Sequence, residues 1–235
     1  MQLGVRDAAS ILAVSEKTIY RWIKSGKLPA YRVNEQYRFN RAELLEWATS
    51  QRVNVSADIF QEPAEAGEDE LTGLVEALEA GGIHYRISGQ DKASVLRSVV
   101  EVMRLGDDVD RQFLLQVLLA RESLGSTGIG EGIAIPHVRN PIVMYIQRPM
   151  ITLCFLEKPI DFAAIDGRPV HTLFTIVSPT IRGHLNLLSK LAFSLREEGF
   201  KNAVLQQASR EVILAEARKA QDRLLLETAA QGEPK

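Results

Sequence analysis

One segment of the sequence joins a glycine-rich loop to a histidine, and residue types at this spacing could carry a phosphoryl group. Residues 123–137 read Ser-Leu-Gly-Ser-Thr-Gly-Ile-Gly-Glu-Gly-Ile-Ala-Ile-Pro-His. Glycines leave backbone N–H groups exposed, and Ser126 and Thr127 add hydroxyl donors. An imidazole beside such donors, here His137, is a place to hold a phosphoryl group on nitrogen. The same spacing also fits a glycine-rich turn followed by a core histidine at a strand end, because Pro136 cannot continue a central strand.

This segment resembles the active-site signature of a known family, the enzyme IIA domains of the fructose, mannitol and nitrogen-regulatory type. These domains belong to the bacterial sugar phosphotransferase system. The residues that carry the resemblance are Arg121, Gly125-Ser126-Thr127-Gly128-Ile129-Gly130 and Gly132-Ile133-Ala134-Ile135-Pro136-His137. The order of elements follows the family over residues of roughly 71–220. Val138 stands where the family usually has Gly, which narrows backbone freedom directly after the histidine.

The resemblance implies phosphoryl transfer between histidines, a reaction that requires no metal or other cofactor. A neutral ring nitrogen of His137 would accept the group from a phosphohistidine on an HPr-type phosphocarrier. Arg121 would offset charge on the phosphoryl oxygens, and His184, which matches the family's second active-site histidine, would bind those oxygens or orient His137. The residues implied to cradle the phosphoryl group are Ser126, Thr127 and Gly128. His84 and His171 match no family position and are expected to be structural.

The first part of the chain is basic and has the pattern of a small helical domain. Residues 1–52 hold nine Lys/Arg and five Asp/Glu, a net charge of +4. Spacing predicts helices over 5–13, 15–25 and 41–51, with a hairpin over 30–39. This order resembles the small winged helix-turn-helix of the excisionase and MerR-like family. The matching residues are Ala8-Ala9-x-Ile11-Leu12-x-Val14-Ser15, Thr18-Ile19-Tyr20-Arg21, Gly26-Lys27-Leu28-Pro29 and Tyr37-Arg38-Phe39.

The second predicted helix of this segment carries a basic stripe with one tyrosine, which can enter the major groove of DNA. The residues of this stripe recur at helical spacing, so they share one exposed face: Lys17, Tyr20, Arg21 and Lys24. The predicted DNA-binding residues are Lys17, Thr18, Tyr20, Arg21, Lys24 and Arg38. Lys24 and Arg38, together with Lys27, are better placed for phosphates than for bases. The same charges also fit an ordinary solvated helix face. Because a single copy offers few contacts, we expect a homodimer that reads two half-sites.

Changes of composition predict the remaining domain boundaries. Residues 53–70 hold six acids and no base and lack a periodicity that could bury a face, which predicts an acidic flexible linker. Residues 71–228 alternate helical patterns with apolar runs, which predicts an α/β domain with a mixed sheet covered by helices on both faces. A helix over 109–122 is expected to bring four side chains to the core: Phe113, Leu114, Val117 and Leu118. Residues 229–235 are expected to be a disordered tail.

Composition argues against disulfide chemistry and membrane insertion. Cys154 is the single cysteine and lies in an apolar run, so we expect a buried small hydrophobe. The longest apolar stretch, around 142–156, is interrupted by Gln147, Arg148 and Pro149, too soon for a membrane span. The first residues lack the apolar core of a signal peptide. We therefore expect a cytoplasmic protein with no membrane partner.

Three functions follow from these patterns. The first is a regulator whose DNA-binding head is controlled by phosphorylation of His137, since a phosphoryl group adds close to two negative charges. The second is a phosphotransfer component that hands the group from HPr to a separate enzyme IIB. The third is a metal hydrolase using His137 and His184, which has only Glu131 nearby in sequence as a further ligand. The first two describe a phosphohistidine carrier rather than a turnover enzyme.

Overall fold

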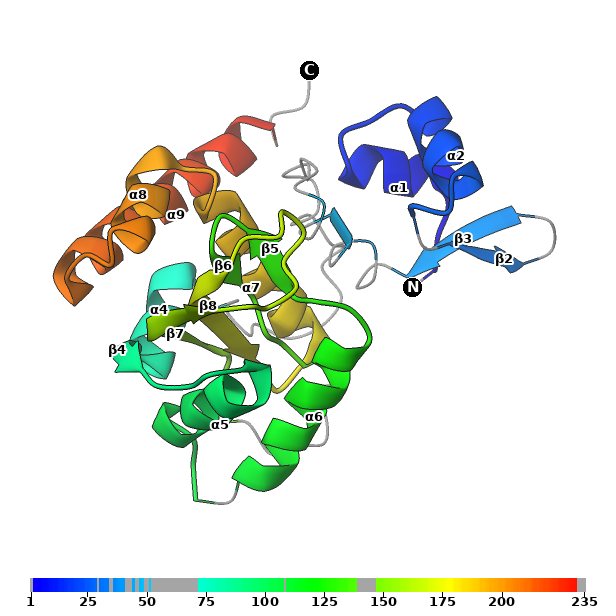
Figure 1. Ribbon diagram of the computed structural model, residues 1–235. Coiled ribbons are helices and arrows are strands. Elements are labelled where there is room, and N and C mark those ends of the chain that lie inside the picture. Colours follow the sequence, from blue (N-terminus) through cyan, green and yellow to red (C-terminus); the bar gives the residue numbers. More distant parts are fainter. Residues whose placement is uncertain are drawn as a thin grey trace. The chain divides into compact units, whose positions relative to one another are not determined.

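The chain divides into two compact units, Met1–Asp69 with Leu224–Lys235, and Glu70–Arg223 (Figure 1). The computed structural model describes residues 2–28, 30–33, 36–40, 44, 47–48, 51, 72–107, 109–138 and 147–231. The predicted linker, 53–70, and most of the predicted helix over 41–51 lie outside these residues. Leu44 and the pair Trp47 and Ala48 are helical. The domain boundaries drawn from composition therefore stay predictions.

The first unit has the predicted order of helix, turn, helix and hairpin. Its elements are β1 (Gln2–Leu3), α1 (Val5–Ile11), α2 (Glu16–Lys24), β2 (Tyr31–Val33) and β3 (Gln36–Asn40). Ser15 caps α2 by accepting a hydrogen bond from the Thr18 N–H at 3.3 Å. Gly26 follows the helix with φ of +67°, the left-handed conformation that glycine permits. The strand β1, which pairs with β3, was not predicted because two residues carry no readable alternation.

The second unit is built on a five-stranded mixed sheet in the order β4-β7-β8-β6-β5. The strands are β4 (Ile83–Ile87), β5 (Gly128–Gly130), β6 (Ile133–Ala134), β7 (Met150–Ile160) and β8 (Val170–Val177). β4 pairs with β7 in parallel and β6 pairs with β8 in parallel, whereas β7–β8 and β5–β6 are antiparallel. The short strands β5 and β6 are the two arms of the glycine-rich segment. The fold therefore places that segment at one edge of the sheet, beside the central strand β8.

Helices cover both faces of this sheet, as predicted. They are α4 (Leu74–Gly81), α5 (Lys92–Val102), α6 (Arg111–Ser123), α7 (Ile181–Ser194), α8 (Glu198–Leu205) and α9 (Arg210–Gln231). Alternate residues of β7 enter two separate cores: Cys154 packs with side chains of α5 and α6, and Phe155 packs with those of α4, α7, α8 and α9. Within the described residues, no helix combines the length and the apolar character that crossing a membrane requires.

Two expectations about the helices were wrong, and one helix was missed. Phe113 is 37% exposed, because it lies about 100° around α6 from Leu114, which faces the core. The helix α8 was not predicted, since Gly199 weakens the helical pattern near its start. The helix α9 continues to Gln231, so the predicted disordered tail at 229–235 begins too early; alanines at 229 and 230 favour helix.

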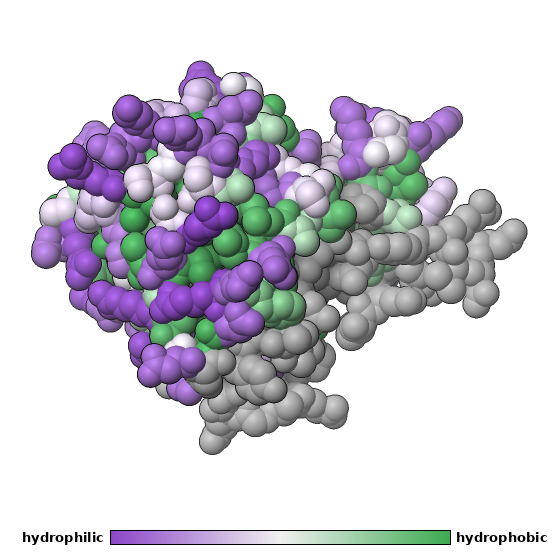
Figure 2. Space-filling model, turned by 60° about the horizontal axis from the view of Figure 1, so that its bottom comes forward, coloured by the Kyte–Doolittle hydropathy of each residue, from purple (hydrophilic) through white to green (hydrophobic). Residues whose placement is uncertain are grey.

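Figure 2 shows that hydrophilic residues cover much of one face of the molecule, with hydrophobic residues gathered between them.

Candidate functional site

His137 lies three residues after the end of β6 and forms an isolated parallel bridge with Ile176 of β8. The residue is buried, and its ring Nδ1 lies 2.8 Å from the carbonyl oxygen of Ile135. A carbonyl oxygen can only accept a hydrogen bond, so we assign the proton to Nδ1. In the neutral ring the lone pair is then on Nε2. The backbone two residues away thus selects which ring nitrogen carries the lone pair.

His184 lies beside His137, with 5.2 Å between the ring centroids and 35° between the ring planes. It sits in the first turn of α7, which Thr180 caps by accepting from the Gly183 N–H at 3.0 Å. Burial, and then electrostatic interactions with His137 and Arg121, lower the pKa of His184 to about 3. His184 is therefore neutral near pH 7 and can donate a hydrogen bond without carrying a charge of its own.

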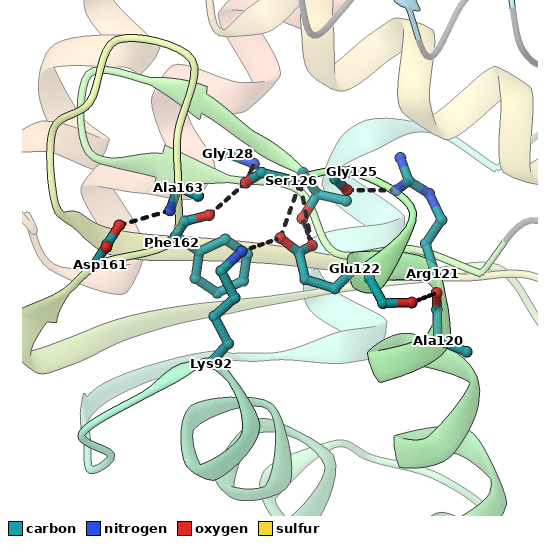
Figure 3. A network of polar contacts seen from close by, with 12 residues as sticks. Lys92, Ala120, Arg121, Glu122, Gly125, Ser126, Gly128, Asp161, Phe162 and Ala163 are labelled. Atoms are coloured by element: carbon teal, nitrogen blue, oxygen red, sulfur yellow. Dashed lines mark hydrogen bonds and ion pairs between the residues drawn. The ribbon is translucent and has the colours of Figure 1, made fainter.

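Arg121, in the last turn of α6, completes this group. Its Nη1 donates to the carbonyl oxygen of Gly125 at 2.9 Å, which holds the start of the glycine-rich loop against the helix (Figure 3). Its charge also contributes to the lowered pKa of His184. The structure therefore brings together His137, His184 and Arg121, the three residues predicted to be catalytic. Their roles in phosphoryl transfer stay predictions.

The predicted phosphoryl-binding residues have protein partners of their own. The Ser126 hydroxyl donates to the Phe162 carbonyl oxygen at 2.5 Å and accepts from the Gly128 N–H at 3.0 Å. Thr127 donates its N–H and its hydroxyl to the carboxylate of Glu122, the hydroxyl at 2.6 Å. These contacts shape the loop, and the predicted role of the three residues toward a phosphoryl group stays untested.

Glu122 and its partner Lys92 are the residues that the sequence reading missed. The Lys92 Nζ lies 3.1 Å from the Glu122 carboxylate, and both come from helices of the same unit. One signal could have found Glu122: an acid in the last turn of a helix opposes the helix dipole and therefore needs a reason to be there. Lys92 carries no such signal, since its neighbours in sequence do not indicate that it reaches α6.

No metal site emerges in the part of the chain that the structure describes, where no three His, Cys, Asp or Glu side chains come together. The carboxylate of Glu131, which a metal hydrolase would need, forms an ion pair with Lys201 at 2.5 Å.

His171 packs against the loop at Gly132, and its Nδ1 lies 2.8 Å from the Thr172 hydroxyl.

The predicted DNA-binding stripe is exposed on α2. Lys17, Arg21 and Lys24 are exposed, and the ring of Tyr20 is 49% exposed. Tyr20 packs edge-on against Tyr37 of β3, with 6.1 Å between ring centroids. Thr18 is half-buried, and its N–H and hydroxyl contact the Ser15 cap. The side chain of Arg38 lies outside the described residues. One helix face therefore presents three cations and an aromatic ring together.

The stability of the second unit is expected to fall in acid because of His184. Its folded pKa, about 3, lies below its ordinary value of 6.5, so the unfolded state binds more protons. This contribution is complete above 6.5 and is lost as the pH falls toward 3. Between about pH 7.5 and about pH 5.5 the wild type should lose about 1.4 kcal/mol more than His184→Asn in urea unfolding. Equal losses in the two proteins would contradict a neutral buried His184. His84 and His171, whose pKa values burial also lowers, are present in both proteins.

Gly128 is expected to tolerate no side chain. A Cβ at this position would lie 2.8 Å from both Cα and Cβ of Ala164. Overpacking of this kind costs about 1–3 kcal/mol, so Gly128→Ala should lower the free energy of unfolding by that amount. Urea unfolding of the variant beside the wild type measures it, and an unchanged value would contradict the close approach.

Two family models match the chain, one over each part. The model described as "Phosphoenolpyruvate-dependent sugar phosphotransferase system, EIIA 2" matches residues 76–219, and a helix-turn-helix domain model matches residues 3–52. The chain is similar to the nitrogen regulatory protein of Pseudomonas aeruginosa, with 38% identity over 125 residues that make up 52% of this chain and 79% of the relative.

Two further comparisons agree with these matches. The fructose-specific EIIABC component of Bacillus subtilis is 33% identical over 144 residues, which make up 60% of this chain but only 22% of that relative. Among solved structures, the nitrogen regulatory protein IIA-Ntr from Neisseria meningitidis matches with a TM-score of 0.53 and 27% identity. That match covers 61% of this chain and 98% of the solved chain.

Proposed function

Because the chain belongs to the EIIA 2 family of the phosphoenolpyruvate-dependent sugar phosphotransferase system and carries a helix-turn-helix domain, we propose that it is a DNA-binding regulator controlled by phosphorylation of His137. One observation carries the proposal: the hydrogen bond from Nδ1 to the Ile135 carbonyl leaves Nε2 as the nucleophile, beside a neutral His184. The donor is an HPr-type phosphocarrier that itself bears a phosphohistidine.

In the proposed step, the Nε2 lone pair of His137 forms a bond to phosphorus while the P–N bond of the donor breaks. The electron pair of that bond stays on the donor ring, which is protonated on its other nitrogen and leaves as neutral imidazole. His137 keeps its Nδ1 proton and gains positive charge, so its hydrogen bond to the Ile135 carbonyl becomes stronger. The protein holds one tautomer throughout, and little reorganisation is needed.

His184 and Arg121 would stabilise the phosphoryl oxygens from two directions. His184 is neutral because burial, and to a smaller extent the nearby His137 and Arg121, lower its pKa, and it can donate an N–H to an oxygen. The Arg121 guanidinium lies close enough to His184 to affect its pKa and would offset the negative charge. Because a bound phosphoryl group brings negative charge, it should raise the pKa of His184 above its value in the unphosphorylated protein.

The exposed face of α2 supports the second half of the proposal. Three cations and Tyr20 on one helix of a helix-turn-helix suit the major groove and its flanking phosphates. A homodimer on DNA would supply the contacts that one copy lacks, and it predicts two half-sites of opposite direction. Phosphorylation would change the charge of the second unit and, through that, DNA affinity, dimerisation or partner choice.

The alternative function is transfer of the phosphoryl group from His137 to a separate enzyme IIB. The similarity to the fructose-specific EIIABC component of Bacillus subtilis favours this reading, since that protein's name joins EIIA with EIIB. The helix-turn-helix domain favours regulation instead. Both functions require the same phosphoacceptor.

A transfer assay tests the proposal and separates the two readings. The full chain is incubated with enzyme I, an HPr-type carrier and labelled phosphoenolpyruvate, then isolated and mixed with IIB domains. Label that enters the chain and is not passed to IIB supports the regulator. Label that moves quickly to IIB favours the transfer component. A chain that takes no label from any HPr-type carrier contradicts both.

A further inference from the structure

A buried carboxylate binds the glycine-rich loop through hydrogen bonds to Thr127. Glu122, at the end of α6, has a side chain that is 5% exposed and accepts hydrogen bonds from Thr127 through both of its oxygens. Lys92, the first residue of α5, reaches the same carboxylate with Nζ at 3.1 Å (Figure 3). Helix α5, helix α6 and the loop therefore meet at one partly buried ion pair.

By itself, a buried carboxylate at the end of a helix destabilises the fold, so contacts with the loop and with Lys92 must offset its cost. A carboxylate that is buried without partners costs several kcal/mol, and one at a helix C-terminus also opposes the dipole. Lys92 offsets the charge and is itself held in place, with Nζ 5.0 Å from the centroid of the Phe162 ring. The Phe162 carbonyl in turn accepts from Ser126, so the residues around the ion pair and the loop restrain one another.

A short path of hydrogen bonds leads from the ion pair to His137. Glu122 fixes Thr127 through its N–H and its hydroxyl. The Thr127 carbonyl accepts from the Ile135 N–H at 3.0 Å. The Ile135 carbonyl then accepts from Nδ1 of His137 at 2.8 Å. A displacement of Thr127 would therefore move the one carbonyl that selects the tautomer of His137.

We propose that the Lys92–Glu122 ion pair is a positioning unit for His137. It holds Thr127, and through Thr127 and Ile135 it keeps the proton of His137 on Nδ1 and the lone pair on Nε2. Neither residue touches the phosphoryl group. The effect on transfer rate rests on the proposed role of His137 as phosphoacceptor, whereas the effect on the tautomer does not.

The tautomer is measured directly by nitrogen NMR of the full chain labelled at histidine. The wild type should show His137 with its proton on Nδ1, and Glu122→Gln should show a mixture of both tautomers or a mobile ring. The matched control is Glu216→Gln, which breaks the exposed Lys219–Glu216 pair and should leave His137 unchanged. An unchanged tautomer in a folded Glu122→Gln protein would overturn the proposal.

Lys92 provides a second test that does not depend on how Glu122→Gln folds, because its side chain is 30% exposed. Lys92→Met should slow phosphorylation by an HPr-type carrier about 10- to 100-fold, since small displacements at a transfer site cost that much. Lys92→Arg keeps the charge and should recover most of the rate. Equal rates for Lys92→Met and the wild type would overturn the proposal.

These experiments distinguish a failure of the proposed function from a failure of the proposed positioning role of Lys92 and Glu122. A wild type that takes no label, but whose His137 tautomer is fixed and is lost in Glu122→Gln, contradicts the proposed function and leaves the positioning unit standing. A wild type that takes label at a rate unaffected by Lys92→Met, with an unchanged tautomer in Glu122→Gln, contradicts the positioning unit alone.

Discussion

Replacing His137 with alanine is expected to abolish phosphorylation by an HPr-type carrier. The variant loses the ring whose tautomer the Ile135 carbonyl fixes, whereas His184, whose ring centroid lies 5.2 Å from that of His137, is expected to keep its place. Because the nucleophile itself is missing, no label should appear at any carrier concentration. His184→Ala keeps the nucleophile and should lower the rate by about 100-fold, the cost of losing one well-placed donor. Labelled phosphate transferred from phosphoenolpyruvate measures both.

The matched control for this prediction is His84→Ala, which removes another partly buried histidine of the same sheet, on β4. It should take label at the wild-type rate. Label on His137→Ala at the wild-type level would mean that another residue accepts the group, and the assignment of His137 would then be wrong.

Arg21→Ala and Lys24→Ala are expected to weaken DNA binding in different ways. Both side chains are exposed on α2. We expect Arg21 to reach base edges, so its loss should cost about 1–3 kcal/mol, or about 5- to 150-fold in affinity, and relax sequence preference. Lys24 is expected to contact a phosphate, so its loss should weaken binding to all sequences alike and reduce the salt slope by about 1. Fluorescence anisotropy over a range of salt concentrations measures both effects.

Lys219→Ala is the control, since it removes an exposed cation from α9, in the other unit. It should bind DNA as the wild type does. If Arg21→Ala and Lys24→Ala also bind as the wild type does, the exposed face of α2 is a solvated surface and not a DNA-binding one.

The residues of the site could largely be predicted from the sequence, but their contacts could not. His137 and Arg121 lie within one local motif, and His184 was found because it matches the family's second active-site histidine, near the start of a helix. The Nδ1 contact with Ile135 depends on the backbone conformation between β6 and His137, which residue types alone do not determine. Which ring nitrogen carries the lone pair therefore follows only from the three-dimensional structure.

Long-range contacts account for what the sequence reading missed. Lys92 and Glu122 are far apart along the chain and meet only because α5 and α6 pack on the same face of the sheet. In the sequence, the hydroxyls of Ser126 and Thr127 were interpreted as donors to a ligand. The fold shows that they donate instead to the Phe162 carbonyl and the Glu122 carboxylate, respectively. Apolar patterning predicted a mixed sheet with helices on both faces, because strands that are buried on both sides appear as continuous apolar runs. It wrongly assigned Phe113 to the core, because Phe113 is as hydrophobic as its neighbour Leu114, which does face the core.

The measurement that tests regulation most directly compares DNA affinity before and after phosphorylation of His137. A DNA site is selected from a random pool with the full chain, and its affinity is measured by fluorescence anisotropy for the unphosphorylated and the phosphorylated protein. His137→Ala treated with the same phosphorylation mixture is the control. Regulation predicts that affinity for the site changes by about 5-fold or more in the wild type and stays constant in His137→Ala. Equal affinities of the two wild-type states would contradict it.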